Sequence, residues 1–174
     1  MDTSPYSLSS PLGTEANQFA IGTVRTVAKM NKAAPEPWVW HFDRIIASEP
    51  TRARQVLDEL LSQLEGQNWH QRDIFAIHLA AEEALVNAIH HGNGSDRRKF
   101  IHVVCWLNGD RFRIEITDQG PGFDPATLPD PTHSEQIHVP CGRGVMLMRA
   151  FMSRVDFNAA GNGVVMEKVR EADE

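Results

Sequence analysis

Three segments of the chain carry apolar residues at intervals of three and four, which is the repeat of a helix with one buried face. They cover residues 51–65, residues 71–91 and residues 144–153, and each is predicted to be a helix. The apolar positions of the first two helices are Val56, Leu57, Leu60, Leu61 and Leu64, and then Ile74, Ile77, Ala81, Leu85 and Ala88.

Five other segments have the composition or the alternation of β-strands. Asn108-Gly109-Asp110 separates two of them and is a typical hairpin signal, and Gly161-Asn162-Gly163 separates the last two. Strands joined by such short turns are antiparallel. The predicted strands are residues 38–47, 100–107, 111–117, 154–159 and 163–170.

These elements predict an α+β fold, a two-layer sandwich in which helices cover one face of a mostly antiparallel mixed sheet. The predicted domain covers residues 38–174. Residues 1–37 begin with a stretch rich in Ser, Thr, Pro and Gly, which cannot bury much apolar surface, and they are predicted to be an N-terminal tail that is either disordered or docked on the domain.

Composition narrows the class of protein. The formal net charge is -6, which argues against direct nucleic-acid binding, because phosphate contacts need clustered Lys and Arg. No apolar stretch is long enough for a membrane span. The two cysteines, Cys105 and Cys141, form no C-x-x-C pair, and Cys105 lies in an apolar run typical of a buried thiol. We therefore expect a reduced, cytoplasmic protein that does not act at a membrane.

The first motif with chemical content is A-E-E-A-L-V-N-A-I-H-H-G, residues 81–92. Glu83 and Asn87 are four residues apart, so they project from the same face of the predicted helix. One is a carboxylate that can accept a proton, and the other offers an amide oxygen that suits a hard cation. A solvated polar pair would explain the same residues.

The second motif is D-Q-G-P-G-F-D, residues 118–124, which directly follows a predicted strand. Asp118 can direct a carboxylate into a cleft, where it would accept a hydrogen bond from an exocyclic amino group such as that of adenine. Gly120 and Gly122 allow sharp turns or close approach of a ligand. An ordinary Gly-Pro loop remains the alternative.

The third motif is C-G-R-G-V-M-L-M, residues 141–148, in which two glycines open a predicted helix. The free N–H groups and the dipole of a helix N-terminus attract phosphate, and Arg143 adds a guanidinium that can bind phosphate oxygens. A plain helix start with Arg143 in solvent is the alternative. His133, His138 and Cys141 are close in sequence but match no common zinc spacing.

Taken together, the order and spacing of the three motifs resemble those of the GHKL (Bergerat-type) ATPases. The residues within the motifs are similar to those of the anti-sigma-factor serine kinases. The resemblance covers about residues 38–170. It implies that Glu83 is the catalytic general base, that Asn87 binds Mg²⁺, and that Asp118 reads adenine. It further implies that Gly120 and Gly122 lie beside the base, that Gly142, Arg143 and Gly144 bind the phosphates of ATP, and that residues 125–141 form a lid.

The resemblance implies a serine/threonine-protein kinase with ATP and Mg²⁺ as cofactors. Its partners would be a sigma factor and an anti-sigma-factor antagonist, and the chain would form a homodimer. The sequence departs from the family at Asn162-Gly163-Val164, where relatives often carry two threonines near adenine. A nucleotide-gated regulator without kinase activity is the alternative, and a histidine-kinase catalytic domain is disfavoured because the chain has no room for a dimerising helical hairpin.

Overall fold

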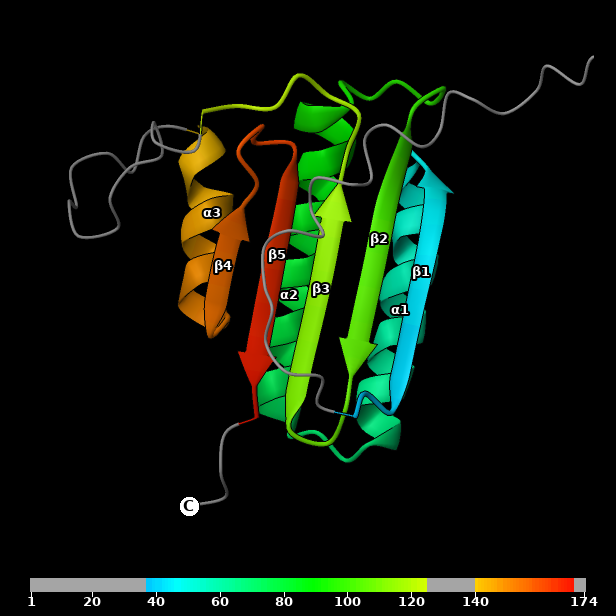
Figure 1. The fold of residues 1–174 in the computed structure, drawn as a ribbon, viewed down its shortest axis with the longest axis vertical. Helices are drawn as coiled ribbons and strands as arrows, with labels where there is room; N and C mark the ends of the chain where they lie inside the picture. Colours follow the sequence, from blue (N-terminus) through cyan, green and yellow to red (C-terminus); the bar gives the residue numbers. More distant parts are fainter. Residues whose placement is uncertain (1–36, 125–139, 171–174) are drawn as a thin grey trace, which may run out of the picture. The chain divides into compact units, whose positions relative to one another are not determined.

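The computed structural model describes residues 37–124 and 140–170, and the side chains of residues 140–143 are outside this description. The predicted N-terminal tail and the predicted lid therefore lie almost entirely outside the described residues. Figure 1 shows the described part as a sheet with its helices on one face.

The sheet has five strands in the order β1-β2-β3-β5-β4, and every pairing between the described strands is antiparallel. This confirms the predicted sandwich. The strands are β1 (Trp40–Ala47), β2 (Phe100–Leu107), β3 (Arg111–Thr117), β4 (Arg154–Phe157) and β5 (Gly163–Val169).

The helices are α1 (Pro50–Gly66), α2 (Gln71–Asn87) and α3 (Pro140–Phe151), and a single π-helical turn, η2 (Ala88–Gly92), follows α2. Two predicted helix boundaries differ from the structure by four residues, and every other predicted end lies within two residues of the observed one. The regular part of the second helix stops at Asn87, because the N–H of Asn93 donates to the carbonyl of Ala88 five residues earlier. The third helix begins at Pro140, four residues before the predicted start, with proline in the first position, where its missing N–H costs nothing.

The core lies between the sheet and the helices. Alternate residues of β3, Phe112, Ile114 and Ile116, point toward the helices and are at most 2% exposed. Leu85 of α2 and Met148 of α3 pack in the same core. This pattern fixes the register of β3, since a shift by one residue would expose all three apolar side chains.

Cys105 lies on the core side of β2 and is fully buried, as predicted, and this burial raises the pKa of its thiol. No helix in residues 37–124 and 140–170 combines the length and the apolar character that crossing a bilayer requires.

Four segments that are distant in sequence meet at one end of the sheet. They are η2, the end of β3, the start of α3 and the turn between β4 and β5, all at the top of Figure 1. The register brings Thr117 of β3 beside Gly163 of β5. The three motifs of the sequence are therefore gathered at this end.

Candidate functional site

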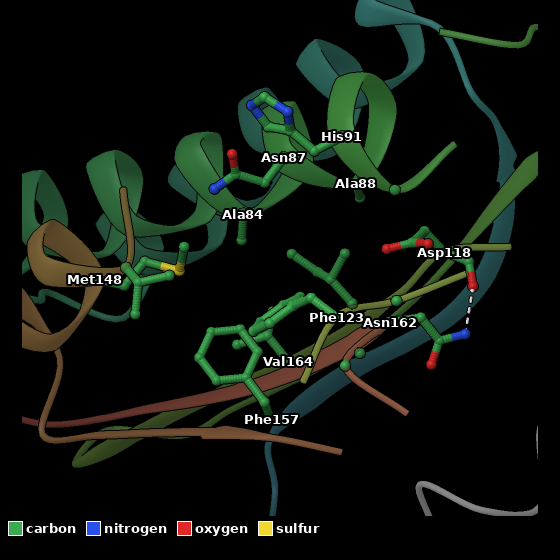
Figure 2. Close-up of a pocket in the computed structure, with 16 residues that line it drawn as sticks. Ala84, Asn87, Ala88, His91, Asp118, Phe123, Met148, Phe157, Asn162 and Val164 are labelled. Carbon is green, nitrogen blue, oxygen red and sulfur yellow. Dashed lines mark hydrogen bonds between the residues drawn. The ribbon is translucent and has the colours of Figure 1, made fainter. Parts of the chain in front are cut away.

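A pocket opens at this end of the sheet, between α2 and the sheet (Figure 2). Its cavity volume is about 180 Å³, which is below the roughly 300–1,000 Å³ of most small-molecule sites, and the cavity opens to solvent. The lining residues are Ala84, Asn87, Ala88, His91, Gly92, Ile116, Asp118, Gly122, Phe123, Val145, Met148, Phe157, Gly161, Asn162, Gly163 and Val164.

Asp118 directs its carboxylate into the pocket from the end of β3 (Figure 2). Its oxygen Oδ1 accepts the N–H of Gly120 at 2.7 Å, so Oδ2 can serve a ligand. Burial raises the pKa of this carboxyl, while the Gly120 N–H and the charge of Lys99 act in the opposite direction. The group is thus a half-buried acceptor, suited to a ligand amino group.

Gly92 makes room for this carboxylate. A Cβ atom added to Gly92 would lie 2.3 Å from Cγ of Asp118, and one added to Gly120 would lie 2.0 Å from the carbonyl oxygen of Gly92. Neither position tolerates a side chain without displacement. The end of the helix and the D-Q-G loop are therefore in direct backbone contact, with Asp118 packed between them.

The main chain beside Asp118 is held from the other side by Asn93. This side chain is 1% exposed. Its Oδ1 accepts the N–H of Gln119 at 2.9 Å, and its Nδ2 donates to the carbonyl of Phe100 at 3.0 Å. A buried amide with both ends bound fixes the loop firmly, because releasing it would leave buried polar groups unsatisfied.

Glu83 and Asn87 lie on one face of α2, as their spacing predicted. Nδ2 of Asn87 donates to Oε1 of Glu83 at 3.2 Å. The amide oxygen of Asn87 therefore points away from Glu83 and is available as a hard ligand, which fits Mg²⁺.

Gly144 of α3 packs directly against Glu83. A Cβ atom on Gly144 would lie 2.0 Å from Oε1 of Glu83 and 2.7 Å from its Cδ. The first turns of α3, which carry free N–H groups, are thus held beside the carboxylate–amide pair. This arrangement places a carboxylate, an amide oxygen and a helix start at one side of the pocket.

The opposite wall of the pocket is apolar and aromatic. The rings of Phe123 and Phe157 meet edge to face with centroids 5.3 Å apart, and both line the cavity. Met148 and Val164 line the same space (Figure 2). Such a wall favours a flat aromatic ligand over a purely ionic one.

Two glycines allow the D-Q-G-P-G-F loop to cross the β4–β5 turn. Gly122 and Gly161 have φ values of 73° and 70°, in the left-handed region. A Cβ atom on Gly122 would lie 1.8 Å from the carbonyl oxygen of Ala160, and one on Gly161 would lie 1.8 Å from that of Phe123. Here both conformation and space require glycine.

The structure brings most of the predicted site residues together. Asn87, Asp118 and Gly122 line the pocket, and Gly120 supports Asp118. Glu83 and Gly144 contact each other at its edge. Gly142 and Arg143 belong to the first turns of α3, and the Arg143 side chain lies outside the described residues. His133 and His138, considered for zinc together with Cys141, also fall outside them, as does the side chain of Cys141.

Sequence reasoning missed several residues of the site. Gly92 was included only as the last residue of the first motif, and Phe157 was not singled out for the pocket. Asn162 was noted only as a departure from the family, although it lines the pocket and binds Asp118. The one sequence signal for the close approach to Asp118 was Gly92, a glycine at the end of the helix that carries the E-x-x-x-N motif.

Comparisons with known proteins agree with this geometry. Residues 46–168 match the family described as "Histidine kinase-like ATPase domain". Over 91 residues, 51% of the chain, the sequence is 29% identical to the serine/threonine-protein kinase BtrW of Bordetella bronchiseptica, and the match covers 64% of that protein.

A solved structure, that of the RsbU and RsbW domains of Rv1364c from Mycobacterium tuberculosis, superposes with a TM-score of 0.51 at 21% identity. The superposition covers 79% of this chain and 32% of that one, and it supports the fold. The family match spans well over half of the sequence and includes all three motifs. The resemblance to the GHKL ATPases is thereby confirmed, and the chain belongs to the histidine kinase-like ATPase domain family.

Proposed function

We propose that the chain binds Mg-ATP in this pocket and is an ATP-dependent anti-sigma factor that phosphorylates a serine of an antagonist protein. The observation that carries the proposal is the arrangement across one cavity. Asp118 lies at one end, and Glu83, Asn87 and Gly144 meet at the other. A base-reading acceptor and a phosphate-side group are both needed to orient a nucleoside triphosphate.

The adenine end uses Asp118 and the apolar wall. The ionised carboxylate accepts a hydrogen bond from the exocyclic amino group, while Phe123 and Phe157 cover apolar surface of the base. The raised pKa of Asp118 is a consequence of the burial that gives this contact its strength, since water competes less for a half-buried acceptor.

The phosphate end uses α2 and the start of α3. The oxygen of Asn87 would hold Mg²⁺, which neutralises phosphate charge when bound. The N–H groups of the first turns of α3, with Gly142, Arg143 and Gly144, would bind phosphate oxygens. Because Gly144 touches Glu83, these phosphates would lie next to the carboxylate.

Phosphoryl transfer would then proceed with Glu83 as general base. Its carboxylate takes the proton of the acceptor serine hydroxyl, and the serine oxygen forms a bond to the γ-phosphorus. The bond between this phosphorus and the β–γ bridging oxygen breaks, and ADP leaves with the electron pair. Positioning by α2 and α3 is the main contribution of the protein to this reaction.

The name of BtrW, a serine/threonine-protein kinase, supports the enzymatic part of the proposal. We further propose that the protein acts in the cytoplasm as a homodimer whose partners are a sigma factor and the antagonist. The chain matches less than two thirds of the length of BtrW, so these partners are proposals for the present chain.

The test uses the full chain with γ-labelled ATP, Mg²⁺ and its antagonist protein. We expect phosphoserine on the antagonist, and we expect Glu83→Gln to abolish it while Mg-ATP still binds. If the wild type binds Mg-ATP tightly but forms no phosphoserine, the proposed kinase activity is refuted. The remaining proposal is then a nucleotide-gated regulator. No magnesium-dependent affinity for ATP would refute the proposal as a whole.

A further inference from the structure

A buried amide lies in the β4–β5 turn, outside the lining of the pocket. Asn158 directly follows β4 and is 6% exposed. Its Nδ2 donates to Oδ1 of Asn162 at 2.9 Å, and its Oδ1 accepts the main-chain N–H of Asn162 at 3.1 Å. Its own main-chain N–H donates to Gly163, and its carbonyl accepts from Gly161. Both ends of the side chain are therefore bound to one residue, Asn162.

Asn162 in turn holds both main-chain groups of Asp118. The N–H of Asp118 donates to the carbonyl of Asn162 at 2.9 Å. Nδ2 of Asn162 donates to the carbonyl of Asp118 at 3.1 Å, the dashed line in Figure 2. The amide of Asn162 can donate to Asp118 only while its oxygen faces Asn158. The orientation of this amide is thus set by the Nδ2 group of Asn158.

The same turn also contacts the loop that carries Phe123. Gly161 packs against the carbonyl of Phe123, and Gly122 packs against the carbonyl of Ala160. A displacement of the turn would therefore move the aromatic wall of the pocket together with Asp118.

We propose that Asn158 is a positioning residue for nucleobase selection, acting through Asn162 on the placement of the Asp118 carboxylate. This inference rests on the proposed nucleotide site. Adenine offers an amino donor where guanine offers a carbonyl oxygen, so a fixed carboxylate accepts a hydrogen bond from the first and repels the second. Discrimination of this kind depends on the acceptor staying in place, because a carboxylate free to withdraw avoids the repulsion.

Two substitutions at Asn158 separate its contacts. Asn158→Asp keeps an acceptor for the N–H of Asn162 but replaces the Nδ2 donor by a second oxygen, which repels Oδ1 of Asn162 and favours a flipped amide. Asn158→Ala removes both contacts. Asn162→Ala removes the donor to Asp118 directly, together with the acceptor for Nδ2 of Asn158, so it tests the same link if the Asn158 variants do not fold.

Asn108→Ala is the matched control. Asn108 lies in the β2–β3 turn, where its Oδ1 accepts the N–H groups of Asp110 and Arg111 at 3.0 and 2.7 Å. It braces a turn as Asn158 does, but at the opposite end of β3 from Asp118. Its loss has a comparable effect on folding and none on the pocket.

The readout is the ratio of the dissociation constants for Mg-GTP and Mg-ATP, measured by titration calorimetry on the full chain. We expect the ratio to fall by about tenfold or more in both Asn158 variants and in Asn162→Ala, in line with the loss of one hydrogen-bonded contact to a charged group. The ratio stays at the wild-type value in Asn108→Ala. The rate of phosphotransfer at saturating ATP is unchanged in both Asn158 variants and in Asn108→Ala, because Glu83, Asn87 and Gly144 are held by α2 and α3 rather than by this turn.

Wild-type selectivity in folded Asn158 variants would overturn this inference and leave the proposed function intact. An equal loss in Asn108→Ala would also overturn it, since a general loosening of the fold would then be the cause. If the wild type itself shows no magnesium-dependent affinity for ATP, the proposed function and this inference both fall.

Discussion

Replacing Gly144 by Ala tests the contact between α3 and the proposed general base. The added Cβ would lie 2.0 Å from Oε1 of Glu83, whereas ordinary contact begins at 3.4 Å, so the carboxylate must move by about 1.4 Å. Gly144 does not have positive φ, so the backbone itself accepts Ala. The substitution moves one functional group, the carboxylate of Glu83, and leaves the helix that carries Gly144 intact.

The expected effects on stability and on activity have opposite signs. Ala in a helix is more favourable than Gly by about 0.5–1 kcal/mol, so the free energy of unfolding stays equal or rises. A displacement of about 1 Å at a catalytic group can cost about 10²-fold in rate, and the hydrogen bond from Asn87 to Glu83 is stretched as well. We expect phosphotransfer to fall by about 10²-fold while the thermal midpoint does not decrease.

Thermal unfolding, calorimetric titration with Mg-ATP and phosphoserine formation from labelled ATP measure the three quantities on one preparation. Gly66→Ala is the control, because a Cβ at the end of α1 meets no atom within 4 Å. Wild-type phosphotransfer in Gly144→Ala would refute the reasoning. So would an equal loss in Gly66→Ala.

Three further predictions concern Asp118, Gly92 and the ion pair between Lys168 of β5 and Asp73 of α2. Asp118→Asn lowers the affinity for Mg-ATP measured by calorimetry. Because the pKa of Asp118 is raised in the folded state, the ionised carboxylate lowers the stability of the wild type at neutral pH, and this cost disappears on acidification. Urea unfolding should therefore show Asp118→Asn to be more stable relative to wild type at pH 7 than at pH 3. Gly92→Ala forces the Asp118 carboxylate away from a Cβ only 2.3 Å from its Cγ, and we expect an affinity for Mg-ATP at least about tenfold weaker, whereas unchanged affinity would show that this close packing does not matter. Lys168→Met removes the cation 3.3 Å from Asp73, whose side chain is fully buried. We expect urea unfolding to show a free energy of unfolding lower by about 3–5 kcal/mol, and a decrease below about 1 kcal/mol would contradict this.

The strands at the centre of the sheet were predictable because local signals agree there. Arg111–Thr117 alternates polar and apolar residues, and Asn108-Gly109 marks the turn before it, so both β2 and β3 have the predicted bounds. The start of α3 was missed because its apolar repeat begins only at Val145, and the polar turn before it carries no periodic signal.

The π-helical turn was missed for a different reason. Residues 88–92 continue the apolar repeat of a regular helix, and the longer hydrogen bond from Asn93 to Ala88 is favoured by the tertiary contact of Gly92 with the D-Q-G loop. The motif residues themselves were predictable, since carboxylate, amide and glycine each have a chemical role at their spacing. Their supports were not, because the side chain of Asn162 binds Asp118, which lies 44 positions earlier in the sequence.

The π-helical turn has a consequence for the evolution of this site. A wide turn of this kind accommodates one more residue than an α-helical turn does. Asn87 directly precedes the turn and Gly92 is its last residue, so the turn sets the distance between the proposed cation ligand and the packing of Gly92 against Asp118. Loss of a single residue between them would rebuild a regular helix and rotate Gly92 out from under Asp118. Homologous chains should therefore tolerate substitutions at residues 88–91 far better than insertions or deletions there.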